Sequence, residues 1–85
     1  MMTDAEFEIM DELYFIKSYS DLERVFAKEN FRLEGELWML ILKGWVKVID
    51  GSDQEIGIEQ EQYLDQKYNL RFNATKQGLM AHNQV

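Results

Sequence analysis

Residues 32–50, RLEGELWMLILKGWVKVID, show the strongest pattern of apolar and polar positions in the chain. On a helical wheel of about 100° per residue, the helix predicted for residues 32–43 is apolar on two opposite sides. The inner side, which we expect to face the other helices, consists of Leu33, Leu37, Leu40 and Ile41. The outer side carries Gly35, Trp38, Met39 and Leu42, with Arg32, Glu36 and Lys43 along one edge. A helix that is apolar nearly all round is normally covered on both sides, so the outer side needs a cover from this chain or from a partner.

A turn and a β-strand follow this helix. Lys43 and Gly44 are typical of a helix C-terminus, because a cation is favourable in the last turn and glycine can adopt a positive φ. Residues 45–49 then favour a strand, with the two valines on one face. Residues 68–73 also alternate apolar and polar side chains, and we expect them to form the strand that pairs with it.

The 18 residues between these strands, 50–67, are too many for a tight hairpin turn. Connections of this length usually have a function, mobility or structure of their own. Ile56 and Ile58 alternate with polar residues and can extend the strand pair. Tyr63 and Leu64 can fold back onto the core. These four apolar side chains stand among six acids, and we expect them to cover the outer side of the helix poorly.

Two helices are predicted before this region. The first spans residues 4–16, with Thr3 or Asp4 as its N-terminal cap. Its buried stripe, at helical spacing, comprises Phe7, Met10, Leu13 and Tyr14. The acids Glu6, Glu8, Asp11 and Glu12 lie mostly off that stripe, on the solvated side.

The second predicted helix begins after Ser20 and ends near residue 27. Glu23 follows Ser20 at the spacing of a capping box, and the inner face comprises Leu22, Val25 and Phe26. A last short helix is predicted for residues 75–82, with Thr75 as its cap. Its inward side chains are Leu79 and Met80. Together these patterns predict an α+β domain with three helices, a β-hairpin and a short C-terminal helix.

Composition limits the chemistry that this chain can perform. Its 85 residues suit one small domain spanning residues 1–85, and 46% apolar content is typical of a folded globule. The absence of cysteine excludes disulfides and thiolate chemistry, and the single histidine, His82, is interpreted as a surface or helix-end residue. Residues 50–61 resemble a calcium loop, but Glu55 stands where glycine is needed. We therefore expect no enzyme activity, no cofactor and no metal.

The chain also lacks signals for a membrane. Its longest apolar run, residues 37–42, is far shorter than the ~20 residues that cross a bilayer. The first residues, MMTDAEFE, lack the basic-then-apolar order of a signal peptide, so we expect a cytoplasmic protein. The net charge of −7 opposes binding to phosphates, and no small-molecule substrate is indicated.

Two motifs give the chain a resemblance to a known fold. Residues 40–46, LILKGWV, are similar to the L-x-x-K-G-hydrophobic-V sequence that ends the recognition helix and starts the first wing strand of winged helix-turn-helix domains. Residues 70–79, LRFNATKQGL, are similar to the sequence where the second wing strand meets the C-terminal helix. Both are common in bacterial winged-helix transcription regulators of the multiple-antibiotic-resistance and phenolic-acid-repressor kinds. The resemblance covers residues 4–82.

This resemblance implies a third helix in the DNA major groove and a wing near the DNA backbone. The residues that would contact DNA are Arg32, Lys43, Lys47 and Arg71. The charges oppose such a contact, because residues 32–43 are neutral and residues 50–67 carry six acids against one lysine, a net charge of −5. DNA affinity depends largely on neutralising phosphates, and the basic patch of a DNA reader is missing.

We therefore expect a regulatory or scaffolding module of winged-helix type that binds protein, with a DNA-binding transcriptional regulator as the alternative. The predicted contact surface consists of Trp38, Met39, Leu42 and Trp45. Tryptophan and methionine are enriched at interface cores. Because the wing is expected to be a poor cover, association of two copies would recover the burial of these side chains. The expected assembly is a homodimer that Met39→Glu weakens.

Overall fold

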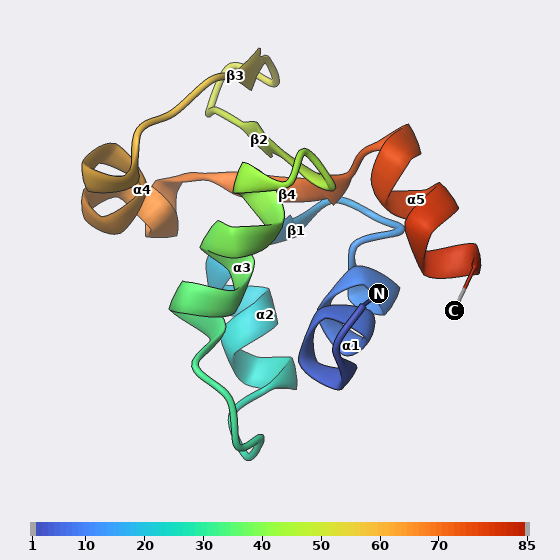
Figure 1. Cartoon of the computed structure of the whole chain (residues 1–85). Coiled ribbons are helices and arrows are strands. Elements are labelled where there is room, and N and C mark those ends of the chain that lie inside the picture. Colours follow the sequence, from blue (N-terminus) through green and yellow to red (C-terminus); the bar gives the residue numbers. More distant parts are fainter. Residues whose placement is uncertain (1, 85) are drawn as a thin grey trace.

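Helix α3 (Leu33–Leu42) lies at the centre of the computed structural model, which describes residues 2–84 (Figure 1). Within these residues the chain forms five α-helices, four short strands and one 3-10 turn, an α+β arrangement. The other helices are α1 (Asp4–Glu12), α2 (Tyr19–Val25), α4 (Gln60–Gln66) and α5 (Lys76–Asn83), and the 3-10 turn spans Lys67–Asn69. The strands are β1 (Lys17–Ser18), β2 (Val46–Ile49), β3 (Glu55–Ile56) and β4 (Arg71–Ala74).

The strands form one antiparallel sheet in the order β1–β4–β2–β3. The central pair places Val46 opposite Ala74 and Val48 opposite Phe72. All four side chains are buried, and they share one face of the sheet because alternate residues of a strand point the same way. Helices α1, α2 and α3 lie together on one side of the strands in Figure 1. The expected pairing across the long connection is confirmed, with the return strand starting at Arg71, three residues later than expected.

Helix α1 begins where the sequence predicted and ends four residues early. Thr3 caps it through a capping box: the Thr3 hydroxyl accepts from the Glu6 N–H, and the Glu6 carboxylate accepts from the Thr3 N–H. The chain then extends to pair β1 with β4. At that junction the Leu13 carbonyl accepts hydrogen bonds from the Ala74 N–H and the Asn73 side chain, both at 2.9 Å. The buried stripe is Ile9, Met10 and Leu13, whereas Phe7 and Tyr14 are partly exposed.

Helix α2 is capped by Ser18, not by Ser20 as the sequence indicated. The Ser18 hydroxyl accepts a hydrogen bond from the Asp21 N–H at 3.1 Å. This early start places Tyr19 in the core, where its ring packs edge-on against Phe72. Strand β1 gave no sequence signal, because two residues are too few to show alternation. Leu22 and Phe26 are buried as predicted, whereas Val25 is half exposed.

The junction between α3 and β2 is a Schellman turn, in agreement with the helix stop predicted there. Gly44 has a φ of +78°, a left-handed conformation that favours glycine. Its N–H donates to the Ile41 carbonyl, and the Trp45 N–H donates to the Leu40 carbonyl. Two of the last four carbonyls of the helix, those of Leu40 and Ile41, are therefore satisfied inside the turn.

Helix α5 packs directly on that turn. Its cap, Thr75, donates its hydroxyl to the Gly44 carbonyl at 2.7 Å and its N–H to the Trp45 carbonyl at 2.9 Å. Gly78 leaves no room for a side chain, because a Cβ there would lie 2.1 Å from the Trp45 carbonyl oxygen. The prediction of an inward Met80 is wrong, since this side chain is 54% exposed.

His82 is buried, contrary to the surface position that we expected. Its ring stacks on Phe7 with 4.2 Å between the ring centroids, and its Nδ1 shares a 2.9 Å hydrogen bond with the Tyr14 hydroxyl. Its Nε2 lies 3.7 Å from the Asp11 carboxylate. Phe7 and Tyr14 therefore contact α5, which explains why they lie outside the main core.

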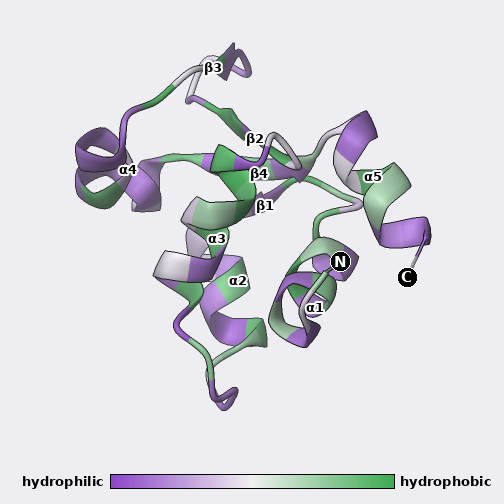
Figure 2. Ribbon diagram, viewed as in Figure 1, coloured by the Kyte–Doolittle hydropathy of each residue, from purple (hydrophilic) through white to green (hydrophobic). Residues whose placement is uncertain are grey.

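The long segment 50–67 contains β3 and α4. Tyr63 of α4 is fully buried. Its ring stacks on Trp38 at 5.3 Å and packs edge-on against Phe72 at 6.2 Å, and its hydroxyl donates to the Glu34 carbonyl at 2.7 Å. Burial raises the pKa of this hydroxyl, so the donated proton is retained. The expectation that this segment covers α3 poorly is thus wrong for half of the outer side, although α4 is mostly hydrophilic (Figure 2).

We expect alanine substitutions at the glycines inside α3 and α5 to have opposite effects on the stability of the fold. Gly78→Ala forces a methyl group into the Trp45 backbone and should cost about 1–3 kcal/mol, which lowers the melting temperature by about 5 °C or more. Gly35→Ala would meet no atom within 4 Å and gains about 0.5–1 kcal/mol of helix propensity. Thermal unfolding at low micromolar protein measures both. A Gly78→Ala variant as stable as the wild type would contradict the close approach of α5 to Trp45.

Candidate protein-interaction surface

The outer side of α3 exposes apolar side chains next to charged ones. Met39 is 46% exposed and Leu42 is 61% exposed, and residues three apart on a helix are neighbours. Gly35 is exposed one turn before Met39, so no side chain projects from the helix there. We define the α3 outer surface as Gly35, Met39 and Leu42 with the edge residues Arg32, Glu36 and Lys43.

Of the four interaction residues predicted from the sequence, two are well exposed. Trp38 is only 8% exposed because Tyr63 stacks over it, so its expected place on the contact surface is corrected to the core. Trp45 is half-buried, and the Lys43 ammonium lies 4.8 Å from the centre of its ring, a cation–π contact. Met39 and Leu42 remain as the exposed apolar pair.

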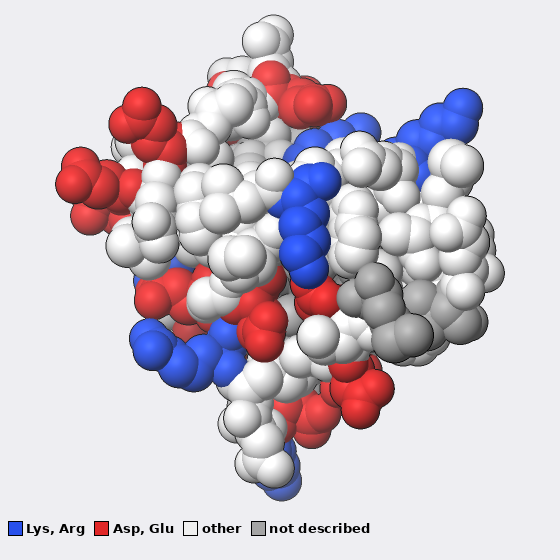
Figure 3. Space-filling model, viewed as in Figure 1, with Lys and Arg blue, Asp and Glu red and all other residues white. Residues whose placement is uncertain are grey.

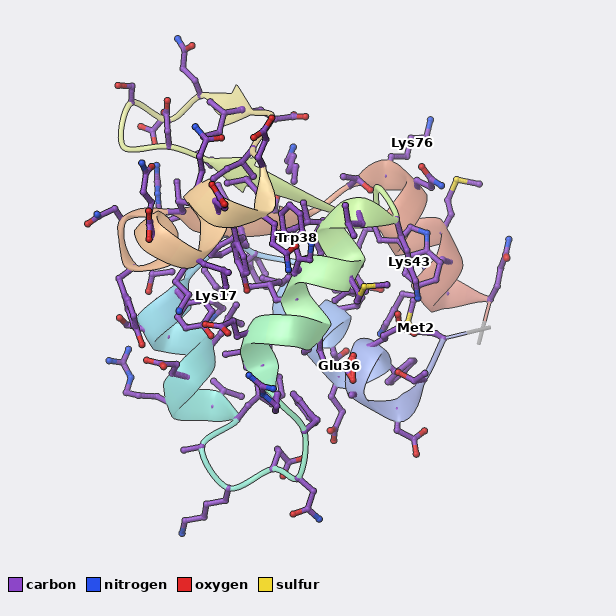
Figure 4. All side chains as sticks on the ribbon, turned by 60° about the vertical axis from the view of Figure 1, so that its left-hand side comes forward. Met2, Lys17, Glu36, Trp38, Lys43 and Lys76 are labelled. Atoms are coloured by element: carbon purple, nitrogen blue, oxygen red, sulfur yellow. The ribbon has the colours of Figure 1, made fainter. Side chains whose placement is uncertain are left out.

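Two shallow grooves adjoin the α3 outer surface, and Trp38 lines both. One runs between α3 and the β2–β3 hairpin, and its apolar lining is Trp38, Ile41, Leu42, Val46, Val48, Ile56 and Ile58. The other lies where α3 and α4 begin, and its lining includes Phe31, Arg32, Gly35, Glu36, Met39 and Gln60. In Figure 4 Trp38 lies on the α4 side of α3, whereas Glu36 and Lys43 lie on the opposite side. A molecule that covers Met39 and Leu42 would thus contact apolar lining on one side and charged residues on the other.

Lys43 is held by a carboxylate of α1. Its ammonium forms an ion pair with Glu6, whose side chain is 4% exposed. The sequence placed Glu6 on the solvated side of α1, and that expectation is wrong. Burial by itself raises the pKa of Glu6, but the Lys43 ammonium and the N–H and hydroxyl groups of Thr3 outweigh it, so this pKa lies below its ordinary value. The pair fixes the end of α3 to the start of α1.

The four residues named for a DNA contact do not form a free basic patch. Three of them have acidic partners: Lys43 pairs with Glu6, Arg71 pairs with Asp53, and Arg32 lies 3.9 Å from Glu34. Lys47 is half-buried on β2. Figure 3 shows acidic side chains gathered over α4 and below α1, with an uncharged area over the upper part of α3 between them. This face therefore offers phosphates little unpaired positive charge.

The groove between α1 and α2 is much more acidic than the α3 outer surface. Its charged lining consists of Glu8, Asp11, Glu12 and Glu29, beside Phe7, Val25 and Phe26. A hydrogen bond with the Glu29 carboxyl raises the pKa of Glu8, as expected where carboxylates are crowded. This groove would repel a second acidic molecule, unlike the α3 outer surface.

No group of three or more metal-ligating side chains within residues 2–84 is arranged to hold a metal ion. Over the same range, every helix is too short or too polar to span a bilayer. No protein-family model, curated protein or solved structure matches the chain.

Two features that support this site were not predicted from the sequence: the burial of Glu6 and the helix that carries Tyr63. Glu6 carried a signal, because Thr3 and Glu6 have the spacing of a capping box, which turns the carboxylate toward the helix start. Tyr63 was recognised as a residue that can return to the core. Helix α4 itself was not predicted, because residues 60–66 contain two adjacent apolar residues and no helical stripe.

The ion pair between Glu6 and Lys43 predicts a loss of stability in acid. Because folding lowers the pKa of Glu6 from its ordinary value of 4.5, its contribution is present above the unfolded pKa and is lost as the pH falls through the folded pKa. Glu6→Gln should cost about 1–3 kcal/mol at pH 7 and weaken this acid dependence. Denaturant unfolding at about pH 7 and pH 3.5 measures both effects, with Glu61→Gln on the exposed side of α4 as the control. Equal losses on acidification in the wild type and Glu6→Gln would contradict the role of the pair.

Proposed function

We propose that this domain is a non-enzymatic regulatory module of winged-helix type that binds protein through the α3 outer surface. The observation that carries the proposal is the exposure of Met39 and Leu42 on the central helix, beside a groove with an apolar lining. Fully burying one such side chain is worth roughly 1.5–3 kcal/mol, which is a large part of the stability of a small domain. A protein that covers both recovers this free energy.

The order of the elements supports a winged-helix assignment. Helices α1, α2 and α3 are followed by β2 and β4, which pair as the two strands of a wing, and then by α5. The two motifs that resemble winged-helix domains also meet in space, since Thr75 of the second donates hydrogen bonds to the Gly44 and Trp45 carbonyls of the first. Strand β1 and helix α4 are additional to the predicted elements, whereas β3 contains Ile56 and extends the strand pair as the sequence allowed.

The added helix α4 favours a protein partner over a nucleic acid. In a DNA complex the outer side of α3 would lie among phosphates. Acidic side chains project from α4 beside it (Figure 3), and the basic residues at the surface edge, Arg32 and Lys43, have acidic neighbours. An apolar strip with balanced charges at its edge suits a protein surface better.

A photo-crosslinking amino acid in place of Leu42 tests the proposal in cells that express the chain. We expect covalent adducts with protein, because this position is exposed within the proposed contact. The same amino acid in place of Met80 on α5, which is similarly exposed, is the matched control and should give few adducts. Adducts with nucleic acid alone, or equal protein adducts at both positions, would contradict the proposal.

The alternative is a DNA-binding regulator, which is favoured by the 89% exposure of Arg32 at the start of α3. One exposed arginine neutralises little phosphate charge. We therefore predict that random duplex DNA binds more weakly than about 100 μM, the weak end of non-specific affinities. Fluorescence anisotropy at low salt measures this affinity. Salt-sensitive binding at low micromolar protein, lost in Arg32→Ala, would establish the alternative instead.

A further inference from the structure

We propose that the α3 outer surface binds a second copy of this chain, with the two α3 helices packed antiparallel. This inference rests on the proposed function, because it names the partner of the same surface. A two-fold axis near Met39 would place Leu42 of each copy over the partner's Gly35, since these positions lie three and four residues on either side of Met39. Contacts between identical surfaces are the commonest way in which identical chains associate.

Gly35 is a feature of α3 that the folded monomer does not explain. Glycine destabilises a helix interior relative to alanine. A Cβ at this position would meet no atom within 4 Å, so nothing in the monomer requires the small residue. Gly78, in contrast, lies against the Trp45 backbone. The approach of a second helix accounts for Gly35, because the missing side chain leaves a hole that the partner's Leu42 can fill.

The charges at the edge of the surface are self-complementary. Glu36 and Lys43 lie on the same side of α3 (Figure 4) and on either side of Met39 along the chain. In an antiparallel pair the same edges of the two helices adjoin in reverse order, so Glu36 of each copy would lie beside the partner's Lys43. Lys43 already pairs with Glu6, but its ammonium has three donors and its side chain is 37% exposed.

Other parts of the surface would repel a second copy. The chain has a net charge of −7, and four carboxylates line the groove between α1 and α2. The segment that carries the α3 outer surface, residues 32–43, has no net charge, and Lys43 is paired with the buried Glu6. Two acidic molecules can therefore meet on this strip without like-charge repulsion.

The contact would be small, because α3 has ten residues and is therefore about 15 Å long. Its buried area would lie at the low end for specific interfaces. We therefore expect a micromolar dissociation constant and a dimer that separates on dilution.

Light scattering of the full chain over a range of concentrations tests the inference. At about 100 μM we expect a mass approaching twice the 10.1 kDa of one chain, falling toward one chain at about 1 μM by mass action. Met39→Glu should weaken the dimer by about tenfold or more, because it brings two carboxylates together near the axis. Met39 is exposed in the monomer, so the fold should remain intact, as circular dichroism can verify.

Two further variants distinguish this arrangement from other self-contacts. Gly35→Ala should raise the stability of the monomer and yet weaken the dimer about tenfold, because it fills the hole beneath the partner's Leu42. Glu36→Lys should also weaken the dimer, because it places a cation beside the partner's Lys43. Glu61→Lys on α4 is the matched control with the same change in net charge. A general charge effect would strengthen association in both lysine variants, since each reduces the acidity of the chain.

The outcomes separate this inference from the proposed function. A monomer at about 100 μM would overturn the inference, whereas crosslinks from position 42 to a different protein would still support a protein-binding module. A dimer that is unaffected by Gly35→Ala and Glu36→Lys would also overturn it, because the contact would then lie elsewhere. Crosslinks from position 42 to the same chain, lost in those two variants, would support it.

Discussion

Helix α3 is apolar on two opposite sides, and the rest of the structure depends on burying both. Its inner side packs in the common core with α1, α2 and the sheet. Its outer side is divided. Tyr63 covers the half that carries Trp38, and Met39 and Leu42 remain exposed on the other half. The buried half stabilises the domain, and the exposed half is the surface from which a binding function can be inferred.

The C-terminal end of α3 and the turn that follows it are both held by long-range polar contacts. At the end of the helix, Lys43 pairs with the buried Glu6 of α1. At the turn that follows, Thr75 donates to the Gly44 and Trp45 carbonyls and brings α5 against the same backbone. These contacts join the first and last helices to the central one. They hold the α3 outer surface on a rigid element, which favours specific binding.

The α3 outer surface differs in charge from the rest of the molecule. The molecule is acidic as a whole, and carboxylates crowd the groove between α1 and α2. Along residues 32–43, however, the charges sum to zero, Arg32 lies near Glu34, and Lys43 pairs with Glu6. A neutral apolar strip on an acidic molecule disfavours phosphates and allows a second acidic protein to approach. Helix α4 adds to this selectivity, because it buries one tryptophan while presenting acids to solvent (Figure 3).

The sequence by itself determined the features that depend on neighbouring residues. The start of α1, the extent of α3, the glycine turn after it and the cap of α5 follow from local backbone preferences and hydrogen bonds within three or four residues. Tertiary structure decided which side chains are buried. Glu6 and His82 are buried by partners 37 and 68 positions away, and Trp38 by a helix without an apolar stripe. Such contacts depend on packing between distant segments, which periodicity along one segment does not encode.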